Sequence, residues 1–236
     1  SYWGFEGDAN DEAGSNDGTA TSPTLTDAQV RRGYSFDGND YIDVGNDTSL
    51  HLTDLTISAW VKQNENNRGY VVISNTPSDS KRPYSMFLSG TDDTVMFHYN
   101  DGSSKSKSWA LGSAIDDGTW HHVVITLSGT SAYLYIDGAS QGLRTLDNPT
   151  TTDSTAGFNI GRRLPNNYHY SGLIDEVGVW NRALSSDEVS ELYDYGSRYD
   201  ERSHSTDFHF RQYKTNYGLF QQPDTLIPNT YDPQTL

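Results

Sequence analysis

The chain has 236 residues and carries 32 acidic against 16 basic side chains, which gives a formal net charge of −16. A surface this acidic repels nucleic acid and anionic membranes, so neither is expected as a partner. Because the chain has no cysteines, disulfides and thiolate metal sites are excluded. No apolar run approaches the length of a membrane-spanning helix, so membrane insertion is not expected either.

The composition favours many short strands joined by turns. Aromatic residues make up 12% of the chain, and Gly, Pro, Asn, Asp, Ser and Thr are frequent. The acidity has two explanations: a solubilising surface with some carboxylates on calcium, or adaptation to high salt, where screening removes self-repulsion. The excess of Asp together with the scarcity of Lys favours high salt.

The N-terminal region contains a strand and an acidic loop. Residues 1–7 alternate aromatic with small or polar side chains, which predicts a first strand. The loop that follows, DANDEAGSNDGTA, offers the carboxylate and amide oxygens that calcium prefers. The same composition is typical of solvated turns, and the spacing of an EF-hand is absent.

Several further strands are predicted along the chain. The sequence DGND at 37–40 is typical of a hairpin turn between strands 33–37 and 40–45. The clearest period of two is at 55–62, where apolar and mostly polar side chains alternate. Other predicted strands are 70–74, 84–89, 95–99, one that begins near 118–124, and 132–137.

Residues 171–195 predict a strand followed by one short helix. Ser185 is expected to cap the helix, and Glu188 completes a capping box. Leu184 and Val189 have the spacing of a hydrophobic staple. Gly196 is expected to end the helix in the left-handed conformation.

The sequence GLIDEVGVWNRALSSDEVSELY at 172–193 closely resembles the closing strand and helix of LamG-like (laminin G-like) domains in the concanavalin A-like lectin/glucanase jelly-roll superfamily. LTISAWVK at 55–62 and GTWHHVV at 118–124 match further strands of that family. The resemblance covers about residues 1–196. It implies an all-β, two-sheet antiparallel jelly-roll sandwich with one short C-terminal helix.

The resemblance also implies a structural calcium ion as cofactor. In many relatives the loop after the first strand helps to hold this ion. The expected ligands here are Asp11, Asn16 and Asp17 of the loop, with Asp175 of the closing strand from across the fold.

Catalysis is not expected, and no catalytic residue is assigned. His121 and His122 are adjacent on a strand and point to opposite faces, so they cannot chelate one ion together and are interpreted as structural. Glycosidases need two carboxylates that flank the scissile bond. Asp175 and Glu176 face opposite ways on a strand, and no other paired-carboxylate motif stands out.

Ligand binding is assigned to two variable loops, 100–109 and 162–170, because loops on a rigid scaffold commonly carry recognition. Aromatic rings and polar groups together suit sugar rings. The candidate residues are Asp101, Trp109, Arg162, Tyr168 and Tyr170. The alternative is that these rings only decorate the surface or pack on neighbouring loops.

Residues 197–236 have no regular period but contain many aromatic side chains, among them Phe208, Phe210 and Tyr213. They are predicted to form an extended C-terminal arm beyond a domain at 1–196. The arm would pack on a partner subunit or on its own domain, and the partner is favoured. The chain is therefore expected to form a homo-oligomer or part of a larger assembly.

The predicted function is a non-catalytic, surface-displayed recognition or adhesion module that binds carbohydrate or a glycosylated host surface. The sequence begins at Ser1 without a signal-like stretch, so a signal was either removed or never present. If none was present, this together with the arm and the acidity suggests the particle of a virus with a halophilic host. The expected location is extracellular or on a virion surface. Alternatives are a secreted or cell-wall adhesin module, an accessory domain of a polysaccharide-degrading enzyme, and a capsid or decoration protein without a ligand.

Overall fold

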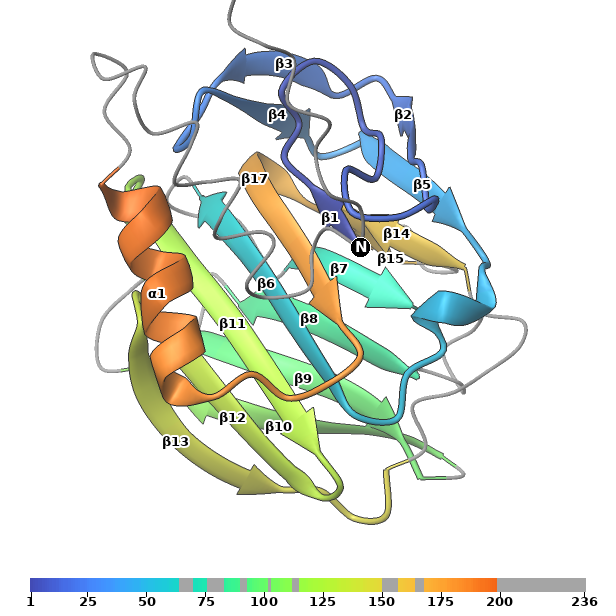
Figure 1. Cartoon of the computed structure of the whole chain (residues 1–236), viewed down its shortest axis with the longest axis vertical. Coiled ribbons are helices and arrows are strands. Elements are labelled where there is room, and N and C mark those ends of the chain that lie inside the picture. Colours follow the sequence, from blue (N-terminus) through green and yellow to red (C-terminus); the bar gives the residue numbers. More distant parts are fainter. Residues whose placement is uncertain are drawn as a thin grey trace, which may run out of the picture.

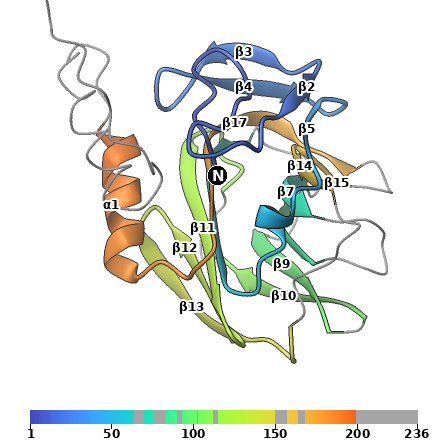
Figure 2. The same ribbon diagram turned by 45° about the vertical axis from the view of Figure 1, so that its right-hand side comes forward.

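The computed structural model describes residues 1–63, 70–75, 83–89, 93–101, 103–111, 115–149, 157–163 and 168–198. These residues form two large antiparallel sheets packed face to face, with a single helix, α1, on the outside of one of them (Figures 1 and 2). The architecture is the jelly-roll sandwich predicted from the sequence. No helix in these ranges is long and apolar enough to cross a membrane.

The eight-stranded sheet has the order β13-β12-β11-β6-β17-β4-β3, and β1 also pairs with β17. Its strands are β1 (Tyr2–Trp3), β3 (Thr24–Asp27), β4 (Arg32–Asp37), β6 (Leu55–Lys62), β11 (Trp120–Ser128), β12 (Ser131–Ile136), β13 (Ala139–Thr145) and β17 (Ser171–Trp180). The closing strand β17 therefore lies in the middle of the sheet and joins β6 to the N-terminal strands.

The seven-stranded sheet has the order β10-β9-β8-β7-β14-β5-β2. Its strands are β2 (Thr19–Thr21), β5 (Tyr41–Gly45), β7 (Tyr70–Asn75), β8 (Tyr84–Ser89), β9 (Thr94–Asn100), β10 (Ser104–Ala110) and β14 (Phe158–Ile160). A short 3-10 helix, η1 (Thr48–Leu50), follows β5, and a separate two-stranded ribbon is formed by β15 (Arg162–Arg163) and β16 (Tyr168–His169).

One turn differs from the prediction. Residues 37–40 do not close a hairpin, because β4 and β5 belong to different sheets. β4 pairs with β17 and β3, whereas β5 pairs with β14 and β2. The polar DGND sequence therefore makes a crossing between the two layers of the sandwich, where Asp40 accepts a hydrogen bond from the backbone N–H of Asp37.

The main core lies between the sheets and follows the period of two. In β6, Leu55, Ile57 and Val61 point inward and are fully buried. The alternate residues Ser58 and Trp60 point outward but are also buried. The outer face is thus covered as well.

Helix α1 (Ser186–Ser197) provides that cover. Ser185 caps it and Glu188 completes the capping box, as predicted. Leu184 and Val189 are both buried in a second apolar cluster that also contains Tyr2, Val124, Tyr135 and Trp180. The helix therefore buries the outer face of the eight-stranded sheet, and this explains why β17 carries buried residues on both faces.

A β-bulge in β17 changes which of its side chains point to which face of the sheet. The register with β6 shifts between Asp175 and Gly178, and Glu176 has a positive φ of 50°. The bulge places Ile174 and Val177 in the same core although they are an odd number of residues apart. The Oδ1 atom of Asp175 accepts a hydrogen bond from the backbone N–H of Glu176 at 2.8 Å, which fixes the bulge.

The predicted role of Gly196 is wrong. The helix continues to Ser197, and Gly196 is not among the glycines with positive φ. A Cβ atom at this position would lie 2.4 Å from Nε1 and 2.6 Å from Cε2 of Trp60. Gly196 is needed because the helix backbone lies directly on the indole ring. The predicted arm falls outside the described residues beyond Arg198.

We expect Gly196→Ala to destabilise the fold, although alanine is the better helix former by about 1 kcal/mol. The new methyl group meets rigid ring atoms, and overpacking of this kind costs about 1–3 kcal/mol. Urea unfolding measures the difference. Ser197→Ala, at the exposed neighbouring position, is the matched control and should leave stability unchanged or slightly raised. A Gly196→Ala protein as stable as the wild type would show that the helix does not rest on Trp60.

Candidate functional site

The β15–β16 ribbon contacts β7, and β15 lies beside β14 and β7 at the side of the seven-stranded sheet (Figure 2). Arg162 is paired with His169 and Arg163 with Tyr168. The loop predicted at 162–170 therefore has regular structure at both of its ends. Residues 164–167 lie outside the described residues.

Tyr168 has an exposed ring that is contacted on one face by a buried arginine. Its exposed fraction is 42%, whereas Arg163 is buried, and the guanidinium carbon of Arg163 lies 4.4 Å from the ring centroid. A guanidinium at this distance attracts the face of the ring. The support is expected to hold Tyr168 in one orientation.

Arg162 organises the adjoining part of this surface. Its guanidinium carbon lies 3.3 Å from the ring centroid of Tyr41, and its Nη2 atom donates to Oδ1 of Asn159 at 2.6 Å. The same nitrogen lies 3.5 Å from Oδ2 of Asp43. A hydrogen bond from Thr21, together with the charge of Arg162, lowers the pKa of Tyr41.

We call the set Tyr41, Asp43, Arg162, Tyr168 and His169 the Tyr41–Tyr168 surface. The rings of Tyr41 and His169 are 6.2 Å apart, and Nδ1 of His169 hydrogen bonds with the carbonyl oxygen of Asp40. The surface combines aromatic faces with charged and neutral polar groups. Of the predicted ligand-binding residues, the ribbon carries both Arg162 and Tyr168, but on opposite faces: Arg162 lies against Tyr41, and Tyr168 lies against Arg163.

Sequence reasoning missed Tyr41 and Asp43 as part of this site. They lie on β5, which reaches Arg162 only because β14 pairs with β5 in the seven-stranded sheet. No local pattern encodes that pairing, so no signal in the sequence could have placed them beside the loop at 162–170.

The prediction that Trp109 and Tyr170 bind a ligand is wrong. Trp109 lies on β10, is fully buried, and donates its indole N–H to the carbonyl oxygen of Gly142 at 2.8 Å. Tyr170 is also fully buried, with its ring 6.2 Å from that of Phe36, and burial raises its pKa. Both rings belong to the core, where no ligand reaches them.

Asp101 has a local role. Its Oδ1 atom accepts hydrogen bonds from the backbone N–H of Ser103 at 3.0 Å and from the Ser103 hydroxyl at 2.8 Å. These bonds close the turn between β9 and β10 and lower the pKa of Asp101. The two strands that this turn joins, β9 and β10, lie at the opposite end of the sheet order from β5 and β14.

The predicted calcium ligands do not come together as one set in the described residues. Asp11 accepts hydrogen bonds from the backbone N–H groups of Tyr2, Ala13 and Asn16, and its own N–H donates to Asp17. These contacts order the N-terminal loop. Within the described ranges, no three His, Asp or Glu side chains are grouped as a metal site would require. Calcium at this loop therefore stays a prediction.

The carboxylate of Asp175 forms its hydrogen bonds away from the N-terminal loop. Its carboxylate accepts hydrogen bonds from the backbone N–H groups of Val30 and Glu176, both at 2.8 Å. Burial, with the neighbouring Glu176 carboxylate, raises the pKa of Asp175 well above its usual range. Glu176 in turn accepts a hydrogen bond from the Tyr2 hydroxyl. This acidic pair joins β17 to β1 and to the segment before β4.

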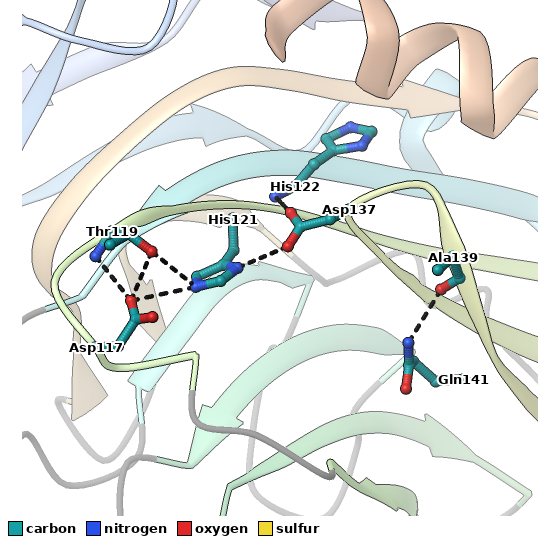
Figure 3. Close-up of polar contacts among 7 residues, drawn as sticks. All are labelled: Asp117, Thr119, His121, His122, Asp137, Ala139 and Gln141. Carbon is teal, nitrogen blue, oxygen red and sulfur yellow. Dashed lines mark hydrogen bonds and ion pairs between the residues drawn. The ribbon is translucent and has the colours of Figure 1, made fainter.

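His121 forms a polar cluster at the beginning of β11, near one end of the strands of the eight-stranded sheet (Figure 3). Its Nδ1 atom is 2.8 Å from Oδ2 of Asp137, and its Nε2 atom is 3.2 Å from Oδ1 of Asp117. Thr119 donates to the same Asp117 oxygen at 2.7 Å. The hydrogen bond and charge of Asp137 raise the pKa of His121 in spite of partial burial. The cluster ties the turn before β11 to the β12–β13 turn.

His122 points the opposite way, as Figure 3 shows. It lies under α1, with its ring 5.1 Å from that of Trp60 and 6.3 Å from that of Tyr193. Its Nε2 atom is 2.8 Å from the Ser58 hydroxyl. Burial lowers the pKa of His122 to about 3, so the ring is neutral. Both histidines support the fold.

The two histidines should give opposite pH dependences of stability. The folded-state pKa of His121 is raised, so its contribution is complete below about 6.5 and is lost as the pH rises through the folded-state value. The folded-state pKa of His122 is lowered, so stability falls by about 1.4 kcal/mol per pH unit from about 6.5 down to about 3. Urea unfolding at a series of pH values measures both slopes.

Matched variants separate the two histidines. In His121→Asn the side-chain amide can still donate to Asp137, but it does not titrate. The loss of stability above neutral pH should therefore disappear. In His122→Gln the side-chain amide can still donate to the Ser58 hydroxyl, but it does not titrate. The steep loss of stability in acid should therefore disappear. The assignment of His122 as a neutral buried ring would be abandoned if His122→Gln retained the acid slope of the wild type.

Comparisons with known proteins place this structure in a family. The Laminin_G_3 model, described as Concanavalin A-like lectin/glucanases superfamily, matches residues 36–190. Adhesion G-protein coupled receptor V1 of Danio rerio is 25% identical over 168 residues, which are 68% of this chain and 3% of that protein. The chain therefore spans a small part of this curated relative.

Solved structures show the same fold. Domain 4 of AbnA, a GH43 extracellular arabinanase from Geobacillus stearothermophilus solved in complex with arabinotriose, has a TM-score of 0.70 at 20% identity and covers 81% of this chain and 96% of that chain. The binding domain of Paraclostridial Mosquitocidal Protein 1 has a TM-score of 0.62 at 18% identity and covers 75% of this chain and 47% of that chain. With the family model matching most of the sandwich, the chain belongs to the laminin G-like family of the concanavalin A-like lectin/glucanases superfamily.

Proposed function

We propose that this protein is a non-catalytic recognition module that binds carbohydrate at the Tyr41–Tyr168 surface. The observation that carries the proposal is the exposed ring of Tyr168, supported on one side by the buried guanidinium of Arg163 at 4.4 Å. An aromatic ring with a fixed orientation and an accessible face provides an apolar platform for a sugar ring. Asp43 and His169, on the Tyr41 side of the ribbon, offer polar groups that can meet the hydroxyl groups of a longer oligosaccharide.

The charges at the surface favour a neutral sugar over an acidic one. The guanidinium of Arg162 already lies 3.5 Å from Oδ2 of Asp43 and donates to Asn159. An anionic ligand would have to compete with Asp43 and would also approach a chain with a net charge of −16. A neutral oligosaccharide meets no such repulsion.

The related proteins support binding without catalysis. The AbnA domain was solved with arabinotriose bound, and the toxin domains of the same fold are described as binding domains. Within the described residues, the adjacent carboxylates of Asp175 and Glu176 are buried, so they cannot flank a bond of a polysaccharide.

We expect Tyr168→Ala to weaken oligosaccharide binding about tenfold or more, because about 1.4 kcal/mol of stacking is lost. Isothermal titration calorimetry with arabinotriose and a panel of neutral oligosaccharides measures the change. Tyr133→Ala is the matched control, since Tyr133 is also exposed but lies on the other sheet.

Equal affinities of the wild type and Tyr168→Ala for a sugar that binds would move the site away from this surface. No binding of any sugar in the panel by the wild type would favour the alternative of a structural protein without a ligand. Arg163→Met adds a further check, because removing the support of Tyr168 should weaken binding without removing the ring.

We further propose that the module is displayed outside the cell, on a cell surface or on a virus particle, in concentrated salt. Domains of the laminin G type are typically extracellular. The net charge of −16 supports a high-salt setting, because screening shortens the range of self-repulsion from about 10 Å at 0.1 M to about 3 Å at 1 M. A secreted adhesin module or an accessory domain of a polysaccharide-degrading enzyme would use the same binding surface.

The high-salt proposal predicts that the melting temperature rises by about 5 °C or more between 0.1 M and 2 M potassium chloride. Differential scanning calorimetry measures the shift. A melting temperature that stays constant or falls over this range would contradict adaptation to salt and leave ordinary solubility as the reason for the acidity.

A further inference from the structure

Two exposed apolar side chains lie together on the outer face of the eight-stranded sheet. Tyr133 on β12 and Leu143 on β13 are direct cross-strand partners, and their exposed fractions are 37% and 42%. Together with Tyr168 they are the exposed large hydrophobic residues of the described part of the chain. We call this pair the Tyr133–Leu143 strip.

The strip continues the apolar cluster under α1. The rings of Tyr133 and Tyr135 are 6.4 Å apart, and Tyr135 is buried in the cluster with Val189 of the helix. In Figures 1 and 2, α1 lies on this side of the sheet and β13 extends beyond it. The helix therefore covers one part of a larger apolar face and leaves the strip beside it exposed.

A segment of the same chain has the composition to cover the strip. The chain continues beyond the end of α1 at Arg198, and residues 208–220 read FHFRQYKTNYGLF. This segment contains five aromatic residues, Arg211 and Lys214, and no acidic residue. Such a stretch is unusual in a chain that carries twice as many acidic as basic side chains.

The charges of α1 complement those of the segment. Asp187 and Glu191 are exposed on the helix. A basic, aromatic segment that lies beside α1 can place its rings on Tyr133 and Leu143 and its cations near these carboxylates. Exposed pairs contribute little each, so the apolar contact supplies most of the energy.

The chain can reach the strip without strain. Helix α1 has 12 residues and is therefore about 18 Å long. The residues from 199 to 207 span up to about 30 Å when extended, which is enough to turn back along the helix. Because the segment is tethered, its effective concentration at the strip is in the millimolar range, which favours the same chain over a second copy.

We propose that segment 208–220 packs on the Tyr133–Leu143 strip of its own chain and forms a second outer layer beside α1. The contact joins the C-terminal region to the sandwich on the sheet opposite the Tyr41–Tyr168 surface. It leaves the proposed carbohydrate site open.

Limited trypsin digestion of the full chain tests this, because the segment contains cleavage sites at Arg211 and Lys214 and is preceded by one at Arg202. In the wild type, cleavage at Arg211 and Lys214 should be at least tenfold slower than at Arg202. Replacing Tyr133 and Leu143 together by Ser should remove this protection. The reciprocal pair Phe208→Ser and Phe210→Ser should do the same, which keeps the test valid if one variant folds poorly.

Tyr168→Ser is the matched control, since it removes an equally exposed ring on the other side of the sandwich. It should leave the cleavage rates unchanged, so the proposed carbohydrate site and this contact can fail independently. Equal cleavage at all three sites in the wild type would overturn the proposal. Protection that rises with protein concentration would also overturn it, because the segment would then be held by a second copy.

Discussion

The fold depends on a cluster of three neighbouring rings, in which Trp60, His122 and Tyr193 all contact one another under α1. The centroids are 5.1 Å and 5.7 Å from the Trp60 ring, and Gly196 lets the helix backbone approach the indole directly. Without α1 at this position, the outer faces of β6, β11 and β17 would expose an apolar cluster to water. The helix thus converts an ordinary two-layer sandwich into one whose central strands are buried on both faces.

This double burial gives the candidate site a rigid base. The β15–β16 ribbon runs directly into Tyr170, a fully buried residue, and then into β17. Tyr168 is therefore two residues from the core, and its ring is supported by a buried arginine. Arginine suits this place better than lysine, because its planar group stacks on a ring face and stays charged when buried. Arg162 and Arg163 are thus placed where an aromatic ring can be supported by a cation.

Local rules predicted much of the fold from the sequence. The capping box at Ser185 and the alternation at 55–62 depend on neighbouring residues only, and both were confirmed. The DGND sequence at 37–40 was misleading because the same turn chemistry serves a hairpin and a crossing between sheets. Gly196 was misassigned for a similar reason, since glycine is required both by a left-handed helix end and by close packing on a ring.

The candidate site shows where sequence reasoning stops. Trp109, Tyr168 and Tyr170 are all aromatic residues in or beside predicted loops, yet two are fully buried and one is exposed. Burial is decided by strand pairing: β10 turns Trp109 toward Gly142 of β13, and β16 turns Tyr168 away from the core. The pairing of β14 with β5 likewise brings Tyr41 to Arg162 across more than a hundred residues of chain. A binding surface assembled by long-range pairing has no local signature, so its residues emerge only once the order of the strands is known.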